Sequence, residues 1–277
     1  MVLARRAQPW LGTIVEISLD RQDDHAFADA FALISEIHKR MSYHSDSSDL
    51  ALLRNSPPGA KVTVSRHTVT VLRLAKQLFI ETDGLFDVSV GRKLVAIGYL
   101  PRMDARPLPH FNGNTGDIEI IDDTHVCCHR SLLIDLGGIA KGYAVDVALS
   151  ALAEHGCEHA LINAGGDLRH MGSNPTDIWL RGGDGLISHK IRIANAAVAT
   201  SSNFLFRRKS HGRLVSPHIG RGSAPLLVDS AITVLAPECA FADAMTKIAM
   251  AHGELAEKML KRAGGSFFAL PIKEDAA

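Results

Sequence analysis

The stretch that decides the fold begins Leu132-Leu133-Ile134-Asp135-Leu136-Gly137-Gly138 and ends Ala160-Leu161-Ile162-Asn163. Between these ends, residues 139–155 have a helical pattern. The stretch is therefore predicted to fold as strand, tight turn, helix and strand. Such a unit places the N-terminus of the helix beside the end of a strand, where backbone N–H groups bind anions.

The same kind of pattern extends in both directions from this unit. Toward the N-terminus, Thr13–Leu19 is predicted to be a strand because polar residues interrupt its apolar ones, and 86–90 is a short extended run. Apolar residues at spacings of three and four predict two helices before residue 84, and the second helix is expected to stop at Gly84. The apolar residues of the first helix are Phe27, Phe31, Ile34, Ile37 and Met41, and those of the second are Val69, Leu72, Ala75 and Phe79.

The last third is predicted to contain more strands than helices. Strands are expected near 178–180, 190–193, 232–235 and 267–270, and a helix is expected to begin near Ala240. Residues 102–116, rich in proline, asparagine and glycine, are expected to be a surface loop. Many strands mixed with about four helices indicate an α+β fold, and residues 1–277 are expected to form a single domain.

Composition narrows the functional classes. Lys plus Arg and Asp plus Glu both number 30, so no net field attracts the chain to nucleic acid or to an anionic membrane. The four cysteines lack CxxC spacing, which favours reduced thiols over a zinc site or a disulfide framework. No signal peptide and no apolar run long enough for a membrane span is recognisable. We therefore expect a soluble, cytoplasmic protein.

Residues 135–143 carry the strongest chemical signal. Gly137 and Gly138 allow a ligand to approach the backbone at a helix start, Lys141 adds a charge for phosphate, and Asp135 offers a carboxylate. The segment lacks the GxxxxGK[ST] pattern of a Walker loop. The alternative is an ordinary strand-to-helix turn with a solvated lysine.

Three other places offer ligand or catalytic groups. A second glycine turn, Asn163-Ala164-Gly165-Gly166-Asp167, follows the next strand. Asp243 and Thr246, three residues apart, are predicted to present oxygens for Mg²⁺ from one helix face, with helix capping as the alternative. His218 is a candidate general base on a predicted turn.

Taken in order along the chain, these segments resemble the ApbE family of FAD:protein FMN transferases. The resemblance rests on the order of the following motifs, which together cover nearly the whole chain: Leu11-Gly12-Thr13, Met41-Ser42-Tyr43, Ser48-Asp49-Leu50, residues 84–91, the 135–143 run with Asp146, Asn163–Asp167, Ala199-Thr200-Ser201 and Ala242-Asp243-Ala244-Met245-Thr246.

The resemblance implies one α+β domain that binds FAD and Mg²⁺. It also implies transfer of the FMN half of FAD to a threonine or serine hydroxyl of an acceptor protein, with release of AMP. By the family pattern, Gly138 and Asp243 are implied as Mg²⁺ ligands, with Thr246 as a third, and His218 is implied as catalytic. The implied FAD contacts are Leu11, Tyr43, Phe86, Asp87, Val88, Asp135, Lys141 and Ile219.

The sequence departs from the family pattern in two places. The loop after His218 and Ile219 continues with Gly220-Arg221-Gly222, where the family usually has Asp-Pro and Thr-Gly. The family's metal-binding threonine commonly lies four residues after the aspartate, which is Lys247 here. The first departure favours an FAD pyrophosphatase as an alternative, and the second favours a flavin-binding protein without catalysis.

Overall fold

The computed structural model describes residues 4–271, which group into two compact units. Of the described residues, the first unit contains 4–38, Lys141–Phe206 and 227–271. The second unit contains Lys39–Ala140 and Arg207–Leu226. That residues 1–277 form a single domain stays a prediction. Among residues 4–271, no helix combines the length and the apolar character needed to cross a bilayer.

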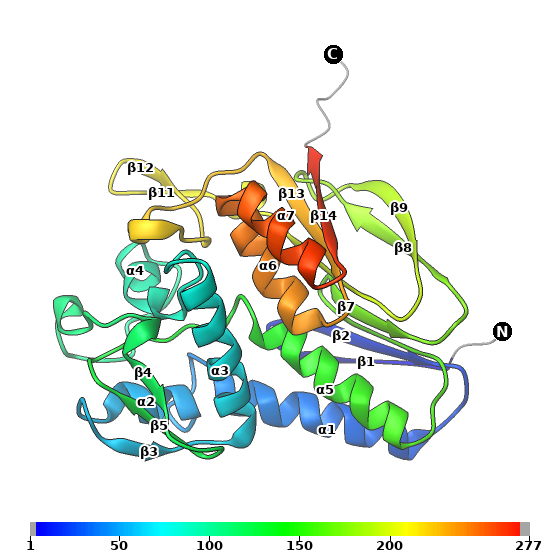
Figure 1. Ribbon diagram of the computed structural model, residues 1–277, viewed down its shortest axis with the longest axis horizontal. Helices are drawn as coiled ribbons and strands as arrows, with labels where there is room; N and C mark the ends of the chain where they lie inside the picture. The colour runs from blue at the N-terminus through cyan, green and yellow to red at the C-terminus, as the bar shows by residue number, and fades with distance from the viewer. Residues whose placement is uncertain (1–3, 272–277) are drawn as a thin grey trace. The chain divides into compact units, whose positions relative to one another are not determined.

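The first unit is built on a seven-stranded antiparallel sheet. Its strand order is β1-β2-β6-β7-β10-β13-β14 (Figure 1). The bounds are β1 Ala4–Trp10, β2 Thr13–Leu19, β6 Ala160–Ala164, β7 Asp167–Met171, β10 Ala197–Ser201, β13 Ser230–Ala236 and β14 Ser266–Pro271.

Four helices accompany this sheet: α1 Asp24–Met41, α5 Ala140–Glu154, α6 Cys239–Ala251 and α7 Gly253–Arg262. Helix α1 begins where the Asp23 carboxylate accepts a hydrogen bond from the Ala26 N–H at 3.0 Å. Its apolar stripe is buried, with Ile34 and Ile37 fully inaccessible. Helix α6 packs against β10 and β13, and α7 packs against α6 and β14.

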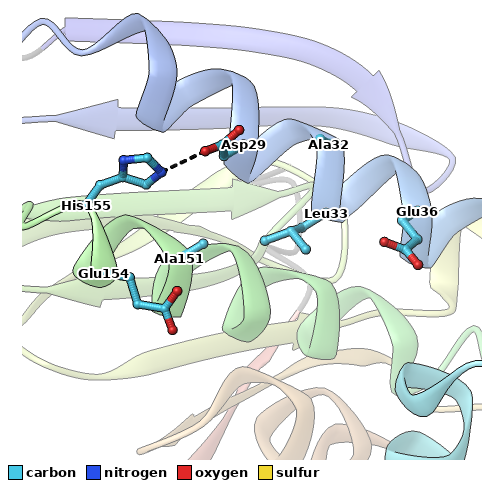
Figure 2. A pocket seen from close by; sticks show the side chains of 7 residues that line it. All are labelled: Asp29, Ala32, Leu33, Glu36, Ala151, Glu154 and His155. Carbon is cyan, nitrogen blue, oxygen red and sulfur yellow. Dashed lines mark hydrogen bonds and ion pairs between the residues drawn. The ribbon is translucent and has the colours of Figure 1, made fainter.

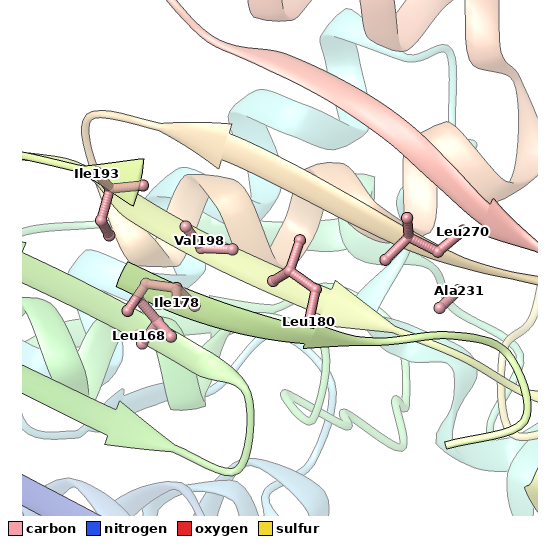
Figure 3. Packing of buried hydrophobic residues seen from close by; sticks show 7 residues of the cluster. All are labelled: Leu168, Ile178, Leu180, Ile193, Val198, Ala231 and Leu270. Atoms are coloured by element: carbon pink, nitrogen blue, oxygen red, sulfur yellow. The ribbon is translucent and has the colours of Figure 1, made fainter. Parts of the chain in front are cut away.

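A separate hairpin of β8 Thr176–Arg181 and β9 Ile187–Ile193 packs against the same sheet. Figure 3 shows the apolar cluster that joins them, in which Ile178 and Leu180 of β8 meet Leu168 and Val198 of the sheet. Because side chains alternate along a strand, Val198 and Ser201 of β10 point to opposite faces. The hairpin and α6 therefore cover opposite faces of the sheet.

The second unit combines short helices with a three-stranded antiparallel sheet of order β3-β5-β4 and a small hairpin, β11-β12. Helix α3 packs against β4. The bounds are α2 Asp49–Asn55, β3 Lys61–Thr63, α3 Arg66–Glu81, α4 Gly91–Ala96, β4 Ile118–Ile120, β5 His125–Cys128, β11 Arg208–Ser210 and β12 Arg213–Val215.

The predicted α+β class is confirmed, and so are most of the long elements. Two predicted strands are wrong. Residues 132–136, which lie in the described part of the chain, form no strand. The run at 86–90 forms a 3₁₀ turn over Val88–Val90, because the Asp87 carboxylate accepts hydrogen bonds from the Ser89 N–H and hydroxyl at 2.8 and 2.7 Å.

The number of helices was also underestimated. The described residues contain seven α-helices rather than about four. Short helix α2 is not predicted from the sequence, and the final helical stretch divides into α6 and α7 at His252. Strand β1 was missed because Arg5, Arg6 and Gln8 leave it almost no apolar alternation.

Gly142 sets the distance between helices α5 and α6. A Cβ atom on Gly142 would collide with the carbonyl group of Cys239 and the backbone nitrogen of Ala240, at the first turn of α6. The two helices therefore approach backbone to backbone, which requires a residue without a side chain.

We predict that Gly142→Ala lowers the free energy of unfolding by roughly 1–3 kcal/mol, the usual cost of forcing a methyl group into a packed contact. Gly253→Ala is the matched control, because a Cβ there would lie an ordinary 3.5 Å from the Phe267 ring. Urea unfolding followed by circular dichroism measures both. Equal stability of the two variants would contradict the close approach.

Candidate functional site

Asp146 of α5 caps the N-terminus of α6. Its Oδ1 accepts a hydrogen bond from the Cys239 N–H at 2.9 Å, and its Oδ2 accepts one from the Ala240 N–H at 2.8 Å. Glu238, the residue at the cap position itself, provides no side-chain cap. Arg169 of β7 holds the same carboxylate at 2.7 Å. One side chain thus satisfies two otherwise unpaired N–H groups and ties α5, α6 and the sheet together.

Lys141, one turn earlier on α5, lies between two buried carboxylates. Its Nζ is 2.7 Å from Oδ2 of Asp167 and 3.5 Å from Oδ2 of Asp243. Both aspartates are buried, at 3% and 0% exposure. Asp243 is the fifth residue of α6, so the alternative that it caps the helix is wrong. The structure brings Lys141 and Asp243 together and adds Asp167.

The three charges perturb one another. Burial opposes the charge on Lys141, but the attraction of Asp167 and Asp243 outweighs burial and raises the pKa of the ammonium. Burial and the neighbouring Asp243 raise the pKa of Asp167. Burial acts on Asp243 in the same direction, yet Lys141 and Lys247 together hold its pKa below the ordinary value. Lys141 and Asp243 are therefore the firmly charged pair.

Lys247 completes this group from the next turn of α6. Its ammonium forms an ion pair with Oδ1 of Asp243 and donates to the Asp243 carbonyl at 3.1 Å and the Ser201 hydroxyl at 3.0 Å. The hydroxyl of Thr246 donates to the same carbonyl at 2.7 Å. The predicted Mg²⁺ ligands Asp243 and Thr246 are thus adjacent, but the Lys247 ammonium already contacts Oδ1 and the carbonyl oxygen of Asp243. These side chains, as placed, do not fit a divalent cation.

The glycine turn at 165–166 links β6 to β7 and positions Asp167. Both glycines have positive φ angles, +67° and +104°, as two-residue hairpin turns require. The side chain of Asn163 accepts a hydrogen bond from the Gly166 N–H at 2.9 Å. Asp167 follows immediately, paired with Ala164, so the turn aims its carboxylate at Lys141.

Leu11 lies in the matching turn between β1 and β2. It has a φ of +56° and precedes Gly12 at +72°. A left-handed conformation costs a leucine roughly 1–2 kcal/mol. Its role in binding FAD stays a prediction, and this outlier is the observation that supports a functional role.

Several predicted FAD contacts lie in the second unit and are buried there. Tyr43 and Phe86 are 5% and 6% exposed, and the Tyr43 hydroxyl donates to the Pro101 carbonyl at 3.2 Å. Burial raises the pKa of Tyr43. Oδ1 of Asp87 also accepts from the Thr115 hydroxyl at 2.7 Å, and the Val88 N–H donates to that hydroxyl at 2.9 Å. In this arrangement Asp87 and Val88 serve the local fold.

Asp135 and Gly138 belong to the same unit as these residues. The Asp135 N–H donates to the Val88 carbonyl at 2.8 Å, which joins the 135–143 run to the 86–88 run. Gly137 and Gly138 form the predicted turn before α5. Contacts of Asp135 with FAD and of Gly138 with Mg²⁺ stay predictions.

His218 and Ile219 lie in a loop that the buried Ser216 organises. The Ser216 hydroxyl lies 2.5 Å from the Leu226 carbonyl and accepts a hydrogen bond from the His218 N–H at 3.2 Å. Ile219 forms a β-bridge with Pro225. The loop that departs from the family pattern is thus a defined turn, which gives His218 a fixed backbone position.

Two hollows in the first unit are not lined by Lys141, Asp167 or Asp243. One of about 770 Å³ lies beside the β8–β9 hairpin and is lined by Gly165 of the second glycine turn, Trp179 and Phe206 among others. The other, of about 420 Å³, lies between α1 and α5. Nε2 of His155 lies 2.9 Å from the Asp29 carboxylate among the lining residues, and Figure 2 shows the two side chains pointing toward each other.

A second group of potential metal ligands lies in the second unit. Glu119, Cys127 and His129 place their ligand atoms within 4.8 Å of one another. Nε2 of His129 lies 2.8 Å from the Glu119 carboxylate, and its Nδ1 lies 3.9 Å from the Cys127 sulfur. A thiol and an imidazole suit softer ions than Mg²⁺.

Sequence reasoning missed the roles of Gly142, Asp146 and Ser201. The first two are four residues apart on α5 and therefore lie on one helix face, so their spacing could have indicated a shared contact surface. Ser201 belongs to a motif of the resemblance, but its contact with Lys247 joins β10 to α6 across 46 positions, so no local pattern predicts that contact. Lys247 was noticed only as a departure from a pattern.

The fold and site define an α+β protein whose central helix pair presents paired ammonium and carboxylate groups beside glycine turns. The chain belongs to the ApbE family, whose model matches residues 11–268. It is 27% identical over 243 residues to the FAD:protein FMN transferase of Vibrio cholerae, covering 80% of this chain and 72% of that one. It is 26% identical over 247 residues to the Chlamydia pneumoniae protein of the same name, covering 84% and 76%.

Solved structures support the same fold. The apo form of the Pseudomonas stutzeri flavinyl transferase ApbE superimposes with a TM-score of 0.82 at 20% identity, covering 99% of this chain and 92% of that chain. The ApbE protein of Thermotoga maritima gives a TM-score of 0.83 at 22% identity, covering 97% and 94%.

We predict that Asp146→Asn destabilises the protein by roughly 1–3 kcal/mol, because an amide accepts from one of the two N–H groups and loses the charge that holds Arg169. Asp177→Asn is the control, since that carboxylate also pairs with two cations, Lys190 and Arg192, but on the surface. Chemical unfolding compares the two. A larger loss in the control would contradict the capping role.

Proposed function

We propose that this protein transfers the FMN half of FAD to a serine or threonine hydroxyl of an acceptor protein and releases AMP. The observation that carries the proposal is the match of residues 11–268 to the ApbE family. Two relatives that this chain matches over at least 80% of its length are named FAD:protein FMN transferase. Lys141, charged and 27% exposed at its side chain, supports recognition of a phosphate-bearing substrate.

The reaction is a phosphoryl-type transfer. The acceptor oxygen forms a bond to the phosphorus of the FMN phosphate, and the bond from that phosphorus to the oxygen bridging to AMP breaks. Lys141 and the backbone at Gly137 and Gly138 are proposed to bind the pyrophosphate. His218 is proposed to take the proton of the attacking hydroxyl. Leu11, Tyr43, Phe86, Asp87, Val88, Asp135 and Ile219 remain the proposed FAD contacts.

The implied Mg²⁺ would be held by Asp243, Thr246 and Gly138 and would neutralise pyrophosphate charge. Since Lys247 occupies two of the Asp243 oxygens, we assign no step to a metal ion. The proposed place of action is the cytoplasm, which the four buried, unbridged cysteines support.

One alternative keeps the same site but uses water as the acceptor. An FAD pyrophosphatase would release FMN and AMP. The loop after Ile219 favours this alternative, because it lacks the Asp-Pro and Thr-Gly pairs that the family usually has there. A flavin carrier without catalysis would bind FAD and leave it unchanged.

Incubation of the purified chain with FAD and a candidate acceptor protein separates the three activities. We expect a fluorescent acceptor band that survives denaturing electrophoresis, with AMP released. Free FMN and AMP without this band would indicate the pyrophosphatase, and unchanged FAD would indicate the carrier. An acceptor in which the target hydroxyl is replaced by alanine is the control.

For His218→Ala we predict a fall in kcat of roughly 10²- to 10⁴-fold, because a positioned base raises the rate of the transfer step by that factor. The affinity for FAD should change little, since proton removal belongs to the transition state. His189→Ala, an exposed histidine on β9, is the control. Full kcat in a folded His218→Ala protein would remove this residue from the mechanism and shift attention to Asp167.

A further inference from the structure

The ammonium of Lys247 has an oxygen partner for each of its three protons. These are Oδ1 and the carbonyl oxygen of Asp243 and the hydroxyl of Ser201. The Asp243 side chain is fully buried and that of Lys247 is 17% exposed. The ammonium is therefore fixed by a complete set of acceptors rather than held loosely at the surface.

The direction of the hydrogen bonds around it follows from the donors available. Lys247 can only donate, so Ser201 accepts from it. Thr246 donates its one hydroxyl proton to the Asp243 carbonyl, so Ser201 is the donor in the 2.8 Å contact between the two hydroxyls. The chain of donors runs from Lys247 through Ser201 and Thr246 to the carbonyl, and no proton is left without an acceptor.

The same oxygens are the kind that a hard divalent cation prefers. A carboxylate, a backbone carbonyl and a hydroxyl meet at one point on α6 and β10. A divalent ion placed there would meet the Lys247 charge at contact distance, with Lys141 also 3.5 Å from Asp243. As built, two ammonium groups balance the two carboxylates of Asp167 and Asp243.

We propose that Lys247 is a built-in cation that takes the place of a divalent metal ion at Asp243. The charge that a metal ion would bring is supplied permanently by the chain, so the site does not take up Mg²⁺. The proposal also predicts that FAD binding does not depend on divalent cations, and this part of it rests on the proposed function.

Metal binding in the absence of FAD tests the proposal. Mn²⁺, which is paramagnetic and prefers similar ligands to Mg²⁺, is titrated into the metal-stripped chain and followed by electron paramagnetic resonance. All variants carry His129→Ala, so that the Glu119, Cys127 and His129 group does not contribute. We expect no binding at Asp243 in the parent chain. We expect Lys247→Thr, which offers a hydroxyl, to bind one Mn²⁺ at this site at least about tenfold more tightly than the parent chain does.

Removing the carboxylate identifies the site that is gained. Adding Asp243→Asn to Lys247→Thr should abolish the new Mn²⁺ site, because an amide lacks the charge that binds a hard cation. A folded Lys247→Thr protein that binds no Mn²⁺ would overturn the proposal. So would a parent chain that binds one Mn²⁺ and loses it on Asp243→Asn.

A second measurement uses the unmodified protein and needs no folded variant. FAD affinity is measured by calorimetry with Mg²⁺ and with a chelator. We expect the two dissociation constants to agree within about twofold. A loss of tenfold or more on chelation would overturn the proposal. Absence of FAD binding in both conditions would instead refute the proposed function, while the Mn²⁺ measurements would still decide the role of Lys247.

Discussion

The contact between α5 and α6 is the constraint on which the rest of the site depends. Gly142 allows the two backbones to touch, and Asp146 binds the free N–H groups of α6 at the same place. This fixes the rotation of α6, so that Asp243 and Lys247, one turn apart, face Lys141 and Ser201. Without that close approach, the buried charges would not have their partners at hydrogen-bonding distance, and burying them would be unfavourable.

Buried charges are tolerated here because each has an opposite partner and because hydrogen bonds take up the remaining donors and acceptors. Breaking a single partnership would leave an uncompensated charge in the interior, which costs far more than a surface ion pair contributes. The turns and the side-chain alternation of the strands position the remaining partners. The 165–166 turn aims Asp167 at Lys141, and the alternation along β10 directs Ser201 toward α6.

Sequence patterns were sufficient where the physical cause is local. The apolar stripe of α1 and the glycines before α5 predicted those elements because helix periodicity and turn conformation act over a few residues. Sequence patterns failed at 86–90, where the Asp87 side chain turns an apolar run into a 3₁₀ turn. They also failed at β1, whose pairing with β2 overrides its polar composition. The contact of Lys247 with Ser201 depends on a strand 46 residues away, which no local pattern records.

A chain that carries its own cation at Asp243 is expected to transfer FMN covalently to the acceptor protein without a divalent metal ion. The most direct test follows an acceptor protein by intact mass while AMP is quantified, with a chelator present throughout. We expect a mass increase equal to FMN less one water, and one AMP released for each FMN attached. Release of AMP and free FMN with no change in the acceptor's mass would contradict the account.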